Sequence, residues 1–154
     1  MKLVRATKTK LIFRLPRRES RSFREILSLY PRTPPAHQPL SKTGQIPDRE
    51  ASQGLLDEAL REQRAENRRQ LLSLLADPKR YQETAAGGQL SLSRSDAEWL
   101  LQVLNDIRVG SWLLVGSPEG RFNGLNEETA PDFWAMEMAG CFQAQLLEAL
   151  GGAA

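Results

Sequence analysis

Cysteine and histidine are almost absent from this sequence. Its 154 residues include one cysteine, Cys141, and one histidine, His37. A single cysteine cannot form an internal disulfide, which favours a reducing compartment, and we expect the cytoplasm. A Cys/His zinc cluster, a His-rich metal site and a Ser-His-Asp triad all need residues that the chain lacks. We therefore expect a protein that is not an enzyme and that has no catalytic residues, no metal site and no cofactor.

Long hydrophobic runs are absent as well. Runs such as Trp112–Val115 are far shorter than the roughly 18 apolar residues of a membrane-spanning helix, so we expect no membrane partner. Residues 1–15 are basic and acid-free like a transit peptide, but their apolar residues alternate as in a strand. Apolar residues make up 40% and charged residues 26% of the chain. These fractions are typical of one soluble globular domain, here residues 1–154.

Acidic residues are scarce at the N-terminal end. Residues 1–24 contain nine basic residues and one acidic residue, Glu19, which is a net charge of +8, whereas the whole chain carries +2. The remaining residues therefore carry −6. This asymmetry indicates either a nucleic acid or another anionic partner for the basic segment, or packing of that segment against the acidic remainder.

The N-terminal residues predict a β-hairpin and a short helix. Two strands are expected at Lys2–Ala6 and Lys10–Leu15, and the second has the period of two of a half-buried strand through Leu11, Phe13 and Leu15. Residues 18–30 have apolar positions at helical spacing, and Pro31 ends this helix. Five prolines in residues 31–47 predict an extended linker rather than a proline-rich recognition motif.

A long helix is predicted from the cap residue Asp48 to Ala76, where Asp77-Pro78 ends it. Its middle, residues 61–70, contains almost no apolar side chain, and the inward positions there hold the neutral amides Gln63, Asn67 and Gln70. We favour a solvated helix middle over an amide-lined contact with a second copy of the protein. Residues 79–89, with Gly87-Gly88, are expected to form a loop.

Two further helices are predicted in the C-terminal half. Ser93 and Asp96 resemble a capping box, and an apolar stripe follows to about Val115. The last helix begins near Thr129 and ends at Gly151-Gly152. Because it is apolar around most of its circumference, it is either central or half-buried against a partner chain, and we expect a homo-oligomer. The predicted fold class is mainly α (α+β), with about four helices and a short N-terminal β-hairpin.

Four residues are candidates for a binding site: Asn105, Asp106, Arg108 and Trp134. Arg108 borders the apolar stripe of its helix, where an ion pair or cap is favoured over a ligand contact. Trp134 and the other tryptophans are favoured as core or interface anchors over pocket residues. Cys141 lies among apolar neighbours and is expected to be a buried, inert thiol.

One set of residues follows a known family pattern: Leu92-Ser93, Asp96-Ala97, Trp99, Phe133-Trp134 and, above all, Leu104-Asn105-Asp106-Ile107-Arg108. Through these residues the chain resembles an uncharacterised bacterial family, a domain of unknown function best represented in actinobacteria. It spans most of the chain, and the sequence departs from the family pattern at Gly110-Ser111-Trp112. The family is typically encoded beside an adaptor of the Clp protease, so the resemblance implies a role linked to protein turnover, with no established activity.

These observations favour a non-enzymatic protein–protein interaction or regulatory module. The alternative is a nucleic-acid-binding protein that uses the basic N-terminal segment, with Phe13 and Phe23 among its charges. A hydrolase or transferase based on Asp106 and Arg108 has the least support, because residues two apart on a helix point to different faces.

Overall fold

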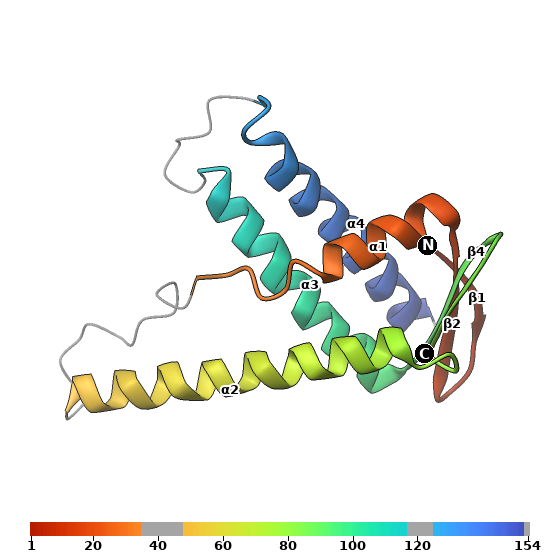
Figure 1. Cartoon of the computed structure of the whole chain (residues 1–154). Helices are drawn as coiled ribbons and strands as arrows, with labels where there is room; N and C mark the ends of the chain where they lie inside the picture. Colours follow the sequence, from red (N-terminus) through yellow and green to blue (C-terminus); the bar gives the residue numbers. More distant parts are fainter. Residues whose placement is uncertain (35–47, 117–124, 153–154) are drawn as a thin grey trace.

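The computed structural model describes residues 1–34, 48–116 and 125–152, which fold into four helices and one antiparallel sheet (Figure 1). The strands are β1 (Lys2–Ala6), β2 (Lys10–Pro16), β3 (Tyr81–Thr84) and β4 (Gly87–Ser93), and the helices are α1 (Arg17–Leu27), α2 (Arg49–Ala76), α3 (Arg94–Leu114) and α4 (Ala130–Gly152). The strand order is β1-β2-β4-β3. The predicted α+β class and the N-terminal hairpin are confirmed.

The sheet buries one face against helices. In β2 the side chains of Leu11, Phe13 and Leu15 are buried, and Phe13 is paired with Leu90 of β4. The alternate residues point to the other face, which no helix of the described chain covers in Figure 1. We call it the open face of the sheet; its residues are Lys2, Arg5, Lys10, Ile12, Arg14, Gln82, Gln89 and Ser91.

The second hairpin, β3–β4, corrects the prediction of a loop over residues 79–89. Gly87-Gly88 signals a turn by composition, but here glycine allows a close approach between strands. Gly87 has a φ of +139°, and a Cβ on it would lie 2.2 Å from the carbonyl oxygen of Leu15. β3 contributes only Tyr81 to the core, so it has no alternating apolar pattern of its own. Its pairing with β4 therefore depends on the rest of the sheet.

The helices α1, α3 and α4 pack over the buried face. Phe23 of α1 meets Phe142 of α4 edge-on, with ring centroids 5.2 Å apart. The capping box of Ser93 and Asp96 is present at the start of α3, and Asp48 caps α2, as predicted. In the described residues, no helix combines the length and the apolar character needed to cross a membrane.

Helix α4 is central rather than peripheral. Its buried residues face the sheet, α1 and α3: Ala135, Ala139, Phe142, Leu146 and Ala149. Cys141 is exposed, so the prediction of a buried thiol is wrong. The reason is geometric, because Cys141 precedes the inward-facing Phe142 by one residue and is rotated by about 100° to the outer side of the helix.

Helix α2 is the longest element and lies at the edge of the fold (Figure 1). Its C-terminal half buries Asn67, Leu71 and Leu74, whereas Leu55 in its N-terminal half is 68% exposed. Most of the predicted linker, residues 35–47 including His37, lies outside the described residues. Within residues 31–34, however, Thr33 is buried, which differs from the expectation of a free linker.

Candidate functional site

The junction of α2 and α3 is built around the side-chain amide of Asn67, which is only 8% exposed. Its Nδ2 donates to the Tyr30 hydroxyl at 2.9 Å, and its Oδ1 accepts from Nε1 of Trp99 at 3.0 Å and from Nε2 of Gln63 at 3.2 Å. Of the three neutral amides that the sequence places at inward positions, Asn67 is buried by contacts within the chain. Gln63, Gln70 and most of the helix middle are exposed, as expected.

The tyrosine of this cluster stays protonated at neutral pH. Burial raises the pKa of Tyr30 above its ordinary value; the hydrogen bond from Asn67 and the charge of Arg64 oppose this shift, while the Asp106 carboxylate adds to it. The hydroxyl of Tyr30 is consequently a hydrogen-bonding group that links the end of α1 to α2.

Asp106 binds the segment that follows α1, residues 32–33, through hydrogen bonds. Its Oδ1 accepts hydrogen bonds from the backbone N–H groups of Arg32 at 2.7 Å and Thr33 at 3.2 Å, and its carbonyl oxygen accepts from the Thr33 hydroxyl at 2.9 Å. Gly110, one turn on, leaves room for this segment, because a Cβ there would lie 2.5 Å from the Arg32 carbonyl carbon. Asp106 is thus occupied by structural contacts.

Two arginines extend this attachment to the neighbouring helices. Arg64 of α2 donates to the carbonyl oxygen of Thr33 at 2.6 Å, and its guanidinium lies 3.9 Å from Oδ2 of Asp106. Arg32 forms an ion pair with Asp132 in the first turn of α4. The segment at residues 32–33 therefore ties α2, α3 and α4 together, and it sets the position of each helix relative to the others.

The outer face of α3 carries two adjoining hollows. One is a groove of about 440 Å³ between α2 and α3, which contains the side-chain amides Gln63, Asn67, Gln102 and Asn105 together with Leu60, Arg64 and Val109. The other, of about 310 Å³, lies between α3 and α4 and is lined by Asn105, Arg108, Val109, Trp112 and Met136. Because Asn105 and Val109 line both, we call the combined surface the α3 trough.

Three of the four predicted binding residues line this trough, and Trp134 does not. Asn105 and Arg108 are exposed, and Asp106 is half-buried. Trp134 lies two residues before Met136 on α4, which turns it to a different side of the helix, where it is 38% exposed. Trp99 is tied to Asn67, and Trp112 lines the trough.

Arg108 does not form the expected ion pair with any residue in the described ranges. It lies over Gly140 of α4, where a Cβ would be 3.4 Å from its Nε. Sequence reasoning also missed Gln63, Gln102 and Met136 as parts of the same surface. The absence of charge at Gln63 was the only sequence signal, and it did not indicate which helix would lie opposite.

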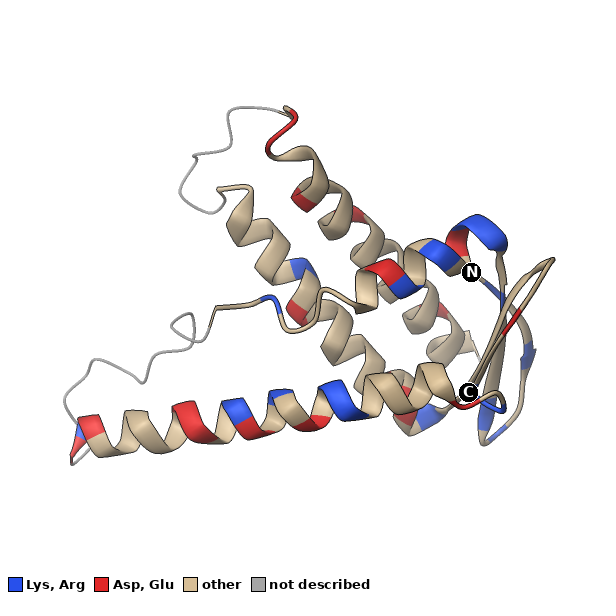
Figure 2. Cartoon of the chain, viewed as in Figure 1, with Lys and Arg blue, Asp and Glu red and all other residues tan. Residues whose placement is uncertain are grey.

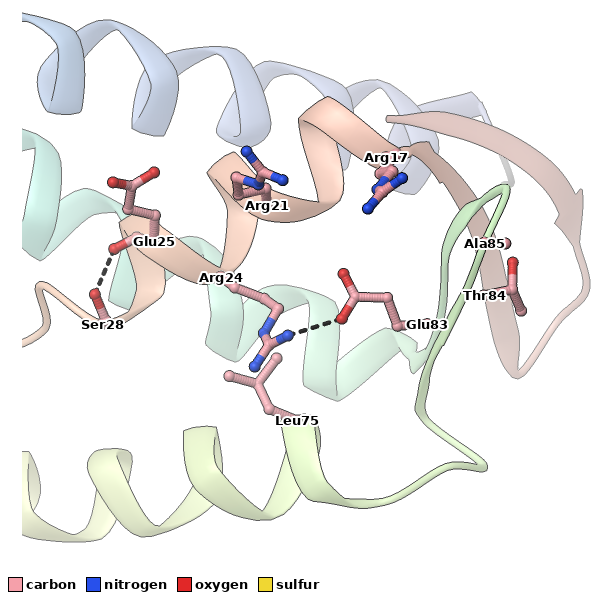
Figure 3. Close-up of a pocket in the computed structure, with 9 residues that line it drawn as sticks. All are labelled: Arg17, Arg21, Arg24, Glu25, Ser28, Leu75, Glu83, Thr84 and Ala85. Carbon is pink, nitrogen blue, oxygen red and sulfur yellow. Dashed lines mark hydrogen bonds and ion pairs between the residues drawn. The ribbon is translucent and has the colours of Figure 1, made fainter.

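A larger hollow of about 710 Å³ lies between α1, the C-terminal end of α2 and the β3–β4 turn (Figure 3). It is lined by three arginines of α1, at positions 17, 21 and 24, and by Glu25 and Glu83. Arg24 pairs with Glu83 at 2.7 Å, and Glu83 also accepts from Ser20 at 3.1 Å. Among the described residues, Arg17 and Arg21 have no carboxylate partner.

The two phenylalanines near the basic N-terminal residues are buried. Phe13 and Phe23 are at most 1% exposed and belong to the core, so they offer no surface for base stacking. Within residues 1–34, 48–116 and 125–152, no three histidine, cysteine or carboxylate side chains come close enough together to hold a metal ion. Comparison with protein-family models, with curated proteins and with solved structures finds no match for this chain.

Proposed function

We propose that this protein is a non-enzymatic interaction module that binds a segment of a partner protein in the α3 trough. The observation that carries the proposal is the pair of adjoining hollows on the outer face of α3, which share Asn105 and Val109 and have walls from α2 and α4. A continuous concave surface of this kind fits an extended or helical segment better than an isolated small molecule.

The chemistry of the trough changes along its length. The part next to α2 is rich in side-chain amides, which both donate and accept hydrogen bonds and so suit the backbone groups of a bound peptide. The part next to α4 is lined by Val109, Trp112 and Met136, which suit an apolar side chain. A partner segment with one apolar anchor followed by polar residues complements both parts.

The contacts beneath the trough hold its shape before a partner arrives. Asn67 joins α2 to α3 and to the end of α1, and Asp106 fixes residues 32–33. A site held in this way loses little conformational entropy on binding. The Asp106 carboxylate, which is the only acid among the described residues that line the trough, is already hydrogen-bonded, and this favours docking over proton transfer.

The resemblance described above supports a partner from bacterial protein turnover in the cytoplasm, and we include that assignment in the proposal. Self-association is the other arrangement that the sequence predicts. The burial of α4 within its own chain gives this helix a role that needs no second copy. A partner protein is therefore the occupant that we propose for the trough.

The test uses a photo-activated cross-linker at Val109, in the floor of the trough, and at Leu72, an exposed residue on another side of α2. We expect one protein from the native cell to be cross-linked from position 109 and not from position 72, with mass spectrometry to identify it. Recovery of a second copy from position 109 would instead support a homo-oligomer, and sedimentation equilibrium would confirm it.

Affinity measurement with the purified partner supplies the control. Asn105→Arg places a long charged side chain at the point shared by both hollows, and we expect calorimetry to show at least about tenfold weaker binding. Gln70→Arg makes the same kind of change at an exposed position outside the trough and should leave the affinity unchanged. Equal binding by wild type and Asn105→Arg would contradict the proposal.

A further inference from the structure

We propose that the open face of the sheet is a second binding surface, which holds the phosphodiester backbone of a nucleic acid without reading its sequence. This inference goes beyond the α3 trough, because the two surfaces share no residue. It rests on four cations from β1 and β2, Lys2, Arg5, Lys10 and Arg14, which the strand register places on the side of the sheet that faces away from the helices. Figure 2 shows basic positions in blue along this part of the sheet.

The strand register places these cations together. Lys2 is opposite Arg14, and Arg5 is opposite Ile12, so that both β1 cations lie beside the β2 cations on one face. All four side chains are exposed, and none forms an ion pair with a residue in the described parts of the chain. The basic segment therefore does not use these cations to pack on the acidic remainder, which was the other interpretation of its charge.

The strands themselves place no carboxylate on the open face; beside it Asp96 of α3, which accepts from the Ser93 N–H, is paired with Arg80 at 3.1 Å. The only acidic residue in the four strands is Glu83, and its side chain is directed to α1, where it bonds to Ser20 and Arg24. The remaining exposed polar residues of this face are Gln82, Thr84 and Gln89, whereas Ser91 is buried. Cations interleaved with amides and hydroxyls are the side chains that contact phosphate and sugar oxygens.

The basic surface continues around the β3–β4 turn. A hollow of about 340 Å³ on the open face includes Arg14, Gln82 and Thr84. Thr84 also lines the hollow of α1 that contains Arg17 and Arg21 (Figure 3). The surface thus has six cations, four on the sheet and two on α1, along a path that bends at the turn.

The chemistry of this face favours a nucleic acid over an acidic protein or an anionic membrane. A membrane surface calls for several bulky apolar residues beside the cations, whereas the described apolar residues there are the partly buried Ile12 at the centre and the smaller Val4 at the β1 bulge. An acidic protein would need pockets for apolar anchors, whereas the open-face hollow is lined by polar side chains, arginine and small residues. A polyphosphate chain needs only cations and hydrogen-bond donors.

The mode of binding follows from the position of the aromatic residues. The strands contain two, Phe13 and Tyr81, and both point into the core. With no aromatic platform on the open face, bases cannot stack on it, so contacts are limited to the backbone. We expect a duplex to bind at least as tightly as a single strand of the same length, and DNA and RNA of different sequences to bind alike.

Fluorescence anisotropy with labelled duplexes of about 20 base pairs tests this, because backbone contacts make affinity fall steeply with salt. We expect measurable binding at about 50 mM salt that weakens by at least about tenfold at about 200 mM. The triple variant Arg5→Gln, Lys10→Gln, Arg14→Gln removes three contacts, which should lower the slope of log affinity against log salt by roughly 2.7.

The matched control removes three cations elsewhere. Arg49→Gln, Arg61→Gln, Arg68→Gln makes the same change in net charge with arginines of α2 that are also exposed and form no ion pair with a described residue. This variant should keep the wild-type salt slope. If both triple variants lose affinity equally, net charge alone is responsible and the proposed surface is wrong.

Three further results would overturn the proposal. These are tighter binding to anionic lipid vesicles than to duplex, binding of polyglutamate as strong as that of duplex, and a preference of more than about tenfold for single strands.

Hydrogen exchange of the wild-type protein gives a readout that needs no variant: duplex should protect β1 and β2 and leave α3 unchanged. A double variant, Arg17→Gln with Arg21→Gln, should lower the slope by about 1.8, and an unchanged slope would remove α1 from the surface.

Discussion

The polar groups at the α2–α3 junction and those on the open face of the sheet are used in opposite ways. At the junction, the Asn67 amide makes three hydrogen bonds and Oδ1 of Asp106 accepts two, all with other parts of the same chain. On the open face, Lys10 and Arg14 make no ion pair within the described residues. The junction residues therefore stabilise the fold, and the open-face cations are available to bind a partner.

The largest expected effect is at Asp106. Asp106→Ala removes the acceptor for the backbone N–H groups of Arg32 and Thr33, and it should lower the free energy of unfolding by about 2–4 kcal/mol. Asp106→Asn keeps an oxygen acceptor and should cost roughly 1 kcal/mol. Urea denaturation followed by circular dichroism measures both. A loss for Asp106→Ala no greater than that for Asp106→Asn would show that the carboxylate does not fasten this segment.

Asn67 gives the next effect. Asn67→Leu leaves the Tyr30 hydroxyl and the Trp99 indole N–H without their partner, which should lower the free energy of unfolding by about 1–3 kcal/mol. The exposed neighbour Gln63 supplies the control, since Gln63→Leu should change stability by less than about 0.5 kcal/mol. If both substitutions have the same small effect, the hydrogen bonds of Asn67 do not stabilise the junction of α2 and α3.

The two tyrosines, Tyr30 and Tyr81, predict a loss of stability in alkaline solution. Burial raises the pKa of both side chains above the ordinary value of 10.0. The unfolded chain therefore loses these protons first. The free energy of unfolding keeps its full value below pH 10.0 and falls as the pH rises above it, by at most about 1.4 kcal/mol per pH unit for each tyrosine. Denaturation curves at a series of alkaline pH values measure the slope. Tyr30→Phe should reduce it, and an unchanged slope would contradict this origin.

The smallest effect on stability is expected on the open face. Lys10→Gln and Arg14→Gln remove exposed charges that make no ion pair in the described chain, and each should change the free energy of unfolding by less than about 0.5 kcal/mol. Thermal unfolding at matched pH provides the measurement. A loss comparable to that of Asn67→Leu would mean that these cations stabilise the fold, and the comparison between the two regions would fail.

The two hairpins show what could be predicted from the sequence. In β1–β2 the alternation of Leu11, Phe13 and Leu15 carries the strand signal locally. In β3–β4 the first strand buries only Tyr81, and Gly87 is needed for close approach to Leu15 rather than for a loop. A strand whose stability comes from its neighbour has no periodic signature, so sequence reasoning assigned it to a loop.

The candidate site was predicted in part for a related reason. Asn105, Asp106 and Arg108 occupy one short stretch of α3, and the sequence singled them out together. Their separate roles depend on other elements: Thr33 lies 73 residues from Asp106 in the chain, and Gly140 lies under Arg108. The helical period indicates that neighbouring residues point in different directions, but it does not indicate which element each one meets.

The amino-acid sequence by itself determined the helices, the first hairpin, the caps at Asp48 and Ser93 and the concentration of positive charge in residues 1–24. These features follow from local periodicity, capping chemistry and charge, which act over a few residues. The tertiary structure decided the β3–β4 pairing, the exposure of Cys141, the internal use of Asn67 and Asp106 and the placement of the basic side chains on one face of the sheet. Those outcomes depend on which distant segments meet, because burial and hydrogen bonding are set by packing between elements.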